Sequence, residues 1–145
     1  MNLLNKNNNM KRKLKNLLYV AAVLLMSVSC KKEDRTTVVF GTVKDDLGKP
    51  IAGLEVELWG VKSSFAGKFT FLKTSKTDMK GEYSITTEIP KDYNFGNLKF
   101  SPDEKILDKY NTSVSTLYFN GNETRDCCSV SVGQKSQYDL VLFRK

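Results

Sequence analysis

The chain has 145 residues, of which 23 are basic and 16 acidic, and it contains no histidine. Five basic residues and no acidic ones lie in residues 1–29, which leaves 18 basic against 16 acidic side chains in the rest. The body therefore lacks the basic face of a nucleic-acid-binding domain, and we expect no nucleic-acid partner. Without histidine, the commonest general base and metal ligand are also excluded.

The first 29 residues have the three-part order of a secretory signal. The positive, polar stretch MNLLNKNNNMKRKLKN is followed by the apolar LLYVAAVLLM and then by the small residues SVS. The apolar stretch is about 13 residues long, whereas a membrane-spanning helix needs roughly 20. The pattern therefore predicts an export signal at residues 1–29 rather than a permanent membrane span.

The residues around Cys30 resemble a bacterial lipoprotein lipobox. Ser29 is the small residue before the cut, and Ser27 stands where that family usually has leucine. The resemblance implies that Cys30 becomes the first mature residue and carries a diacylglycerol on its sulfur. The next four residues are similar to the export signal of surface lipoproteins in one phylum of Gram-negative bacteria: Lys31, Lys32, Glu33 and Asp34. We therefore expect a lipid anchor in the outer membrane, with the protein displayed at the cell surface or facing the periplasm.

After an expected tether at residues 30–36, residues 37–145 show the alternation typical of strands. Turn-forming residues separate the apolar runs, so the segment predicts seven or eight short strands and an all-β sandwich. Residues 102–111 are ambiguous: they fit one helical turn with Pro102 at its first position, or an irregular crossover. The strand segments are 39–44, 54–60, 68–75, 82–89, 97–101, 115–121, 127–133 and 136–145.

Three turn motifs resemble the carboxypeptidase regulatory-like domain. They consist of Gly41, Val43 and Asp45; of Gly48, Pro50 and Gly53; and of Thr77, Asp78, Gly81 and Tyr83. The resemblance implies a transthyretin-like Greek-key sandwich of about seven strands that stabilises, spaces or binds, with no catalytic residue. In physical terms, Gly48 and Gly53 are expected to have positive φ, and Pro50 fixes the backbone between them.

No pattern in the chain points to catalysis, a metal site or a cofactor. The adjacent acids Asp45/Asp46 and Asp103/Glu104 fit turn capping better than an acid–base pair. Neither a calcium-loop ladder nor a phosphate-binding loop is present. Cys127 and Cys128 leave two interpretations open, either one buried and one exposed thiol or a disulfide between neighbours.

Aromatic residues give the best indication of binding. The candidates are Trp59, Phe65, Tyr93 and Phe95. The alternative is that they are covered by loops or plug the ends of the sandwich, since large aromatic side chains are usually buried. We expect a non-catalytic structural or binding module with an outer-membrane protein or a glycan as its partner. Two other classes stay open, namely an adhesin or filament subunit that pairs through an edge strand, and an envelope hydrolase that uses carboxylates alone.

Overall fold

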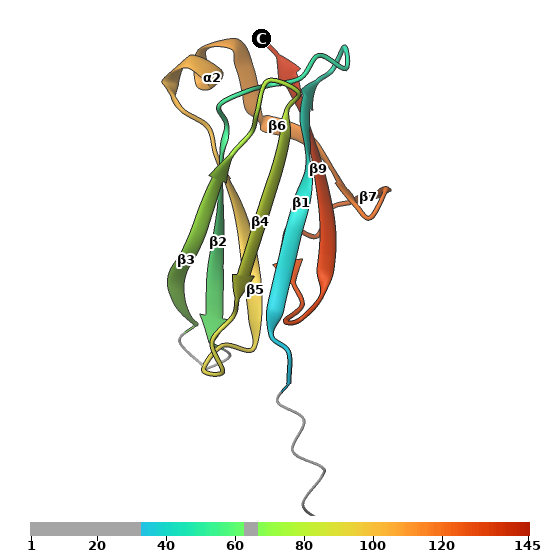
Figure 1. Ribbon diagram of the computed structural model, residues 1–145. Helices are drawn as coiled ribbons and strands as arrows, with labels where there is room; N and C mark the ends of the chain where they lie inside the picture. The colour runs from blue at the N-terminus through green and yellow to red at the C-terminus, as the bar shows by residue number, and fades with distance from the viewer. Residues whose placement is uncertain (1–32, 63–66) are drawn as a thin grey trace, which may run out of the picture. The chain divides into compact units, whose positions relative to one another are not determined.

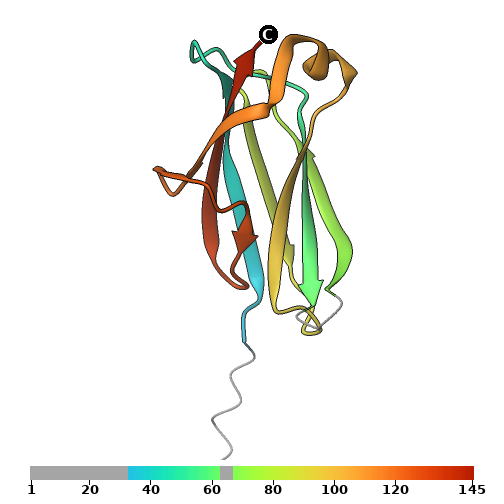
Figure 2. The same ribbon diagram turned by 180° about the vertical axis from the view of Figure 1, so that it is seen from behind.

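The protein is a β-sandwich of two sheets (Figures 1 and 2). The structure, a computed structural model, describes residues 33–62 and 67–145, and Asp34–Lys145 form a compact unit. The strands are β1 (Thr36–Asp45), β2 (Glu55–Lys62), β3 (Lys68–Lys76), β4 (Glu82–Glu88), β5 (Phe95–Ser101), β6 (Tyr110–Phe119), β7 (Asn122–Thr124), β8 (Ser129–Val130) and β9 (Lys135–Arg144). The described part has nine strands. Eight of them fall in the segments that the sequence predicts, including β8 within residues 127–133, and only β7, with three residues, has no predicted counterpart because it is too short to give a periodic pattern.

Strand order explains how the core is enclosed. One sheet has the order β4-β1-β9-β6-β7 and the other β3-β2-β5-β8. The pair β1–β9 is parallel, whereas the other pairs are antiparallel. The predicted alternation is confirmed in β1, β2 and β9, where every second side chain is buried in the core. The largest fully buried side chains of the inner faces include Leu54, Leu58, Ile85, Val39, Val43 and Val56.

The ambiguous segment forms one short helix, α2 (Glu104–Lys109), at the end of the sandwich that also holds the C-terminus (Figure 1). Asp103 is its N-cap, and the Asp103 carboxylate accepts a hydrogen bond from the Ile106 amide at 3.0 Å. The prediction of Pro102 as the first helical residue is wrong. A carboxylate is a far better N-cap than most side chains, so the helix begins after Asp103 and Pro102 stays outside it.

β1 passes close to the backbone of β9 at Gly41. A Cβ atom at this position would clash with the Tyr138 carbonyl oxygen. The same oxygen accepts a hydrogen bond from the Tyr83 hydroxyl at 2.8 Å. Burial raises the pKa of Tyr83, so its hydroxyl stays protonated and remains a donor. Next to this contact, the Asp139 carboxylate accepts bonds from the Thr42 amide at 2.7 Å and the Thr42 hydroxyl at 2.9 Å.

Two copies of one Asp–Gly turn lie together at the α2 end of the sandwich. In the first, the Asp45 carboxylate accepts bonds from the amides two and four residues on, and the Gly48 amide donates to the Asp45 carbonyl. Asp78 and Gly81 repeat every one of these bonds. The φ angles are +80° at Gly48 and +74° at Gly81. Bonds from the Val43 amide to the Gly81 carbonyl, and from the Ile51 amide to the Val43 carbonyl, link the two turns.

The folded unit begins earlier than the expected tether boundary at residue 36. The Arg35 guanidinium donates hydrogen bonds to the carbonyls of Ile89 at 2.8 Å, Tyr93 at 2.7 Å and Pro90 at 3.3 Å. Thr36 already belongs to β1. The predicted tether is therefore too long, since its last residues are held by hydrogen bonds that no periodic pattern reveals.

Candidate functional site

The outer face of the four-stranded sheet carries a cluster of apolar side chains, of which two phenylalanines are exposed, Trp59 and Phe95 are half-buried and Val61 is buried. In one row, Val61 of β2 lies between Phe69 of β3 and Phe95 of β5, and in the next row Trp59 lies beside Phe71. Directly paired residues share one face of a sheet, so both rows point the same way. Phe69 is 58% exposed and Phe71 49%. We call these five residues the aromatic patch.

Trp59 is fixed in the patch by two neighbours. Its ring meets Phe71 edge to face, with the centroids 5.6 Å apart and the planes at 77°. Its indole nitrogen donates to the Glu57 carboxylate at 2.7 Å, which also accepts a bond from the Ser101 hydroxyl at 2.8 Å. The Lys99 ammonium lies 3.9 Å from the same carboxylate. The hydrogen bond from Ser101 lowers the pKa of Glu57, and the hydrogen bond from Trp59 and the charge of Lys99 lower it further.

We expect the fluorescence of Trp59, the only tryptophan in the chain, to report the protonation of Glu57. Because the pKa of Glu57 is lowered in the fold, the stabilising bonds persist as the pH falls to the ordinary value of 4.5 and are lost only below it. Trp59 emission should therefore change with a midpoint below pH 4.5, and Glu57→Gln should abolish this transition. A midpoint at or above pH 4.5 would contradict the geometry around Glu57.

The structure brings together only some of the aromatics that the sequence singles out. Trp59 and Phe95 belong to the patch, whereas the Tyr93 ring lies against Gly60, where a Cβ atom would come within 2.9 Å of it. Tyr93 therefore plugs an end of the sandwich, and Phe65 lies outside the described residues. Sequence reasoning missed Phe69 and Phe71 as binding residues. The sequence does contain a sign that Phe69 and Phe71 are exposed. They are two residues apart on a strand that also carries three lysines, and a strand with so many lysines is unusual in a buried position.

The remaining predicted site residues fall into two groups. Cys30, Lys31 and Lys32 lie outside the described residues, while Glu33 and Asp34 are exposed at the start of the described chain. In residues 33–62 and 67–145, no helix is long and apolar enough to cross a membrane. The turn-motif residues hold the turns and strand crossings near β1 and β4, and none of them lies in the aromatic patch: Gly41, Asp45, Gly48, Pro50, Gly53, Asp78, Gly81 and Tyr83.

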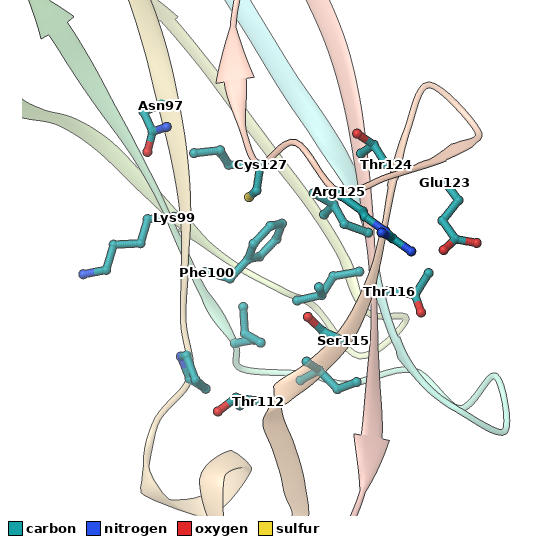
Figure 3. Close-up of a pocket in the computed structure, with 16 residues that line it drawn as sticks. Asn97, Lys99, Phe100, Thr112, Ser115, Thr116, Glu123, Thr124, Arg125 and Cys127 are labelled. Atoms are coloured by element: carbon teal, nitrogen blue, oxygen red, sulfur yellow. The ribbon is translucent and has the colours of Figure 1, made fainter.

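A second candidate site is a cleft of about 550 Å³ between the two sheets (Figure 3). It lies where the chain passes from β7 to β8 through residues 125–128, which we call the crossing segment. The floor consists of core side chains, and the Phe100 ring projects into the space. The polar lining residues are Asn97, Lys99, Thr112, Ser115, Thr116, Glu123, Thr124 and Arg125.

The two neighbouring cysteines lie in the crossing segment and are joined by a disulfide. Cys128 is buried and Cys127 is exposed, which is the division of burial expected for free thiols. Of the two interpretations that the sequence leaves open, the one with two thiols depends on strand geometry, in which neighbouring side chains point to opposite faces. Neither residue is in a strand, because β8 begins only at Ser129, so that restriction does not apply.

The acidic residues that the sequence singles out are occupied in turns, caps and an ion pair. Asp46 pairs with Arg144 at 2.9 Å, and hydrogen bonding from Arg144 lowers the pKa of Asp46. Asp103 caps α2, and Asp45 is held in its turn. Among the carboxylates, only Glu123 lines the cleft. In the part of the chain that the structure describes, no group of three or more cysteine and acidic side chains could hold a metal ion.

Comparisons with known proteins add little to this description. No protein-family model matches the chain, and no curated protein matches it in sequence. Among solved structures, the C-terminal fragment of the pilus adhesin SpaC from Lactobacillus rhamnosus GG matches with a TM-score of 0.43 and 9% identity. The match covers 77% of this chain and 46% of that fragment, so this chain spans less than half of it. A match this weak does not bear on function.

Proposed function

We propose that the protein is a non-catalytic binding module of the bacterial envelope, anchored through a lipid on Cys30, whose aromatic patch binds an outer-membrane protein. The observation that carries this proposal is the exposure of Phe69 and Phe71 beside Trp59 on one sheet face. Contiguous apolar side chains on a protein surface mark a place where a partner removes them from water. Tryptophan and other aromatics are enriched where such contacts contribute most to binding.

The surroundings of the patch indicate the chemistry of its partner. Lys62, at the end of β2, pairs with Asp92 at 3.6 Å, and Lys99 on the opposite flank lies 3.9 Å from the Glu57 carboxylate. The edge-to-face contact of Trp59 and Phe71 leaves no flat platform of the kind on which a sugar ring stacks. An apolar centre whose rim holds charges of both signs fits a protein surface that is apolar in the middle and polar around it.

The position of the patch fits a partner in the membrane. The Asn94 amide donates to the Val61 carbonyl, and the neighbouring loop is bound by Arg35. The row of Val61, Phe69 and Phe95 therefore lies at the end of the sandwich where β1 starts (Figure 1), rather than at the α2 end. The start of β1 at Thr36 lies only six residues after Cys30 in the sequence.

We further propose that the body is a transthyretin-like domain similar to the carboxypeptidase regulatory-like family, with β6 and β7 added to a sandwich of seven strands. This assignment is supported by the three turn motifs and by the Asp–Gly turns that they build. In that family the domain is an accessory without catalytic residues, which agrees with the acids engaged in turns, a helix cap and an ion pair.

The test is capture of the partner by the full chain from solubilised outer membrane of the producing bacterium. The double variant Phe69→Ser/Phe71→Ser removes the exposed rings without touching a fully buried side chain. Its matched control is Leu47→Ser/Met79→Ser, which removes two apolar side chains that are 72% and 85% exposed in the Asp–Gly turns. We expect the first variant to bind the captured protein at least ten-fold more weakly and the control to bind it normally.

The purified partner should also shift the fluorescence of Trp59 when titrated into the protein. If cell-surface polysaccharide, and no protein, shifts Trp59 emission, the partner is a glycan and the proposal of a protein partner is wrong. Equal capture by the wild type and by the Phe69/Phe71 variant would exclude the patch as the binding surface. Liposomes without protein serve as a control for direct contact with lipid, and a Trp59 shift on liposomes alone would also overturn the proposal.

A further inference from the structure

The cleft lies between two sheet edges that are only half paired. Along one edge, strand β5 pairs with β2 over its whole length. Along the other edge, β5 pairs with β8 only at Gly96 and Asn97. β7 covers β6 only at Leu117–Phe119 and leaves Ser115 and Thr116 uncovered on that side. Residues 125–128, the crossing segment, connect β7 of one sheet to β8 of the other, so both short ladders end where this segment begins and ends (Figure 3).

The backbone of Phe100 is aimed at the space where β8 would continue. The Leu98 amide donates to the Cys128 carbonyl at 2.9 Å, so the Leu98 amide points toward β8. Amide directions alternate along a strand, hence the N–H and C=O of Phe100 point the same way. No residue of β8 lies opposite Phe100. An open edge of this kind is a template for one more strand.

We infer that the cleft accepts an extended peptide segment of a partner protein, which continues the β8 position along β5 and inserts an apolar side chain between the sheets. The apolar floor, with Leu98, Leu117 and Leu140 beside Phe100, suits every second side chain of such a strand. A volume of about 550 Å³ has room for more than one side chain. The site is separate from the aromatic patch, which lies on the opposite face of the same sheet, so this inference does not rest on the proposed function.

Charge at the mouth of the cleft defines the partner further. Arg125 lines the cleft from the crossing segment, is exposed, and forms no ion pair with any of the described residues. A carboxylate on the incoming segment, two residues from the apolar one or at its end, would pair with the Arg125 guanidinium. The expected ligand is therefore a short extended peptide that alternates apolar and polar residues and carries an acid.

The opposite edge of the same sheet is protected against strand addition. β3 carries Lys68, Lys73 and Lys76, and a register shift in its pairing with β2 bends the ladder between Leu58 and Trp59. Lysines and bulges are the usual means by which edge strands avoid pairing with other chains. On β5 the only lysine is Lys99, whose side chain points away from the cleft (Figure 3). The geometry therefore selects β5, and not β3, as the acceptor edge.

The test uses a displayed library of random hexapeptides, selected on the full chain in detergent. Ser115→Trp fills the cleft, and Arg125→Glu reverses the charge at its mouth. The matched controls are Ser113→Trp, on the same strand but outside the cleft, and Lys91→Glu, which is exposed elsewhere. We expect enriched peptides that alternate apolar and polar residues and carry an acid, with binding at least ten-fold weaker in both cleft variants and unchanged in both controls.

Hydrogen exchange separates strand addition from simple filling of the cleft. A bound strand should slow exchange of the Phe100 amide at least ten-fold, because that amide then donates to the peptide. Three results would each overturn the inference. The selection could enrich no peptide, the enriched peptides could bind without protecting the Phe100 amide, or they could bind the Ser115→Trp and Arg125→Glu variants as tightly as they bind the wild type. If protection rises with protein concentration without any peptide, a second copy of the chain is the occupant, and the assignment to a partner peptide is wrong.

Discussion

Replacing Gly41 by alanine is expected to destabilise the fold by more than about 3 kcal/mol, a large fraction of the total stability of an ordinary domain. The new methyl group would meet the Tyr138 carbonyl oxygen, which already accepts a bond from Tyr83. Backbone cannot move aside as a side chain can, so β1 and β9 would have to separate at the parallel pair that joins them. Gly81→Ala should cost a similar amount, since its φ is +74° and its methyl group would meet the Val43 carbonyl.

Gly48→Ala is the matched control for both substitutions. Gly48 has a φ of +80°, but nothing lies within 4 Å of the position that its Cβ would take. Only the conformational penalty remains, about 1 kcal/mol. Urea unfolding followed by circular dichroism would measure the three free energies of unfolding. If Gly41→Ala unfolded at the same urea concentration as Gly48→Ala, the close approach of β1 and β9 would be wrong.

Replacing Cys30 by alanine is expected to abolish acylation of the protein completely. The wild-type chain should incorporate a labelled fatty acid and sediment with the outer membrane, while Cys30→Ala incorporates no label. A thioether-linked lipid requires the sulfur, and about 13 apolar residues before it are too few to span the bilayer in its place. The control is Cys127→Ala/Cys128→Ala, which removes the other two cysteines and should leave the label unchanged.

The same cells test where the anchored protein faces. Protease added to intact cells should digest wild-type protein, whereas replacing Lys31, Lys32, Glu33 and Asp34 by alanine should protect it by retaining it on the periplasmic side. An unlabelled wild-type chain would exclude the lipoprotein. A labelled chain that resists external protease would keep the anchor and exclude surface display.

Much of the fold follows from the sequence because most of its strands are long and half buried. In β2, Val56 and Leu58 alternate with Glu57 and Trp59, and this pattern fixes both the strand and its inner face. β7 has three residues, which is below the length at which a period can be recognised. The strand predicted at 127–133 shrinks to the two residues of β8, Ser129–Val130. The parallel pairing of β1 with β9 joins strands about a hundred residues apart, and no local pattern encodes it.

The candidate sites were less predictable than the fold. Trp59, a binding candidate from the sequence, lies on the outer face beside Phe71. The exposure of Phe69 and Phe71 depends on β3 being an edge strand, which only the sheet order reveals. The cleft depends on where pairing stops on β5 and β6, and its lining comes from several separate segments. Cys127 and Cys128 were interpreted with strand geometry although they lie in the crossing segment.

The three hydrogen bonds of Arg35 have a consequence for the strength of binding. They leave four residues from Cys30 to the start of the folded unit at Asp34, a reach of at most roughly 14 Å when fully extended. With the lipid attached, a partner in the same membrane meets the protein in two dimensions, at an effective concentration in the millimolar range. If Cys30 carries the proposed lipid, a contact too weak to survive dilution in detergent would be saturated in the membrane, and the anchor would set the occupancy of the site as much as the contact does.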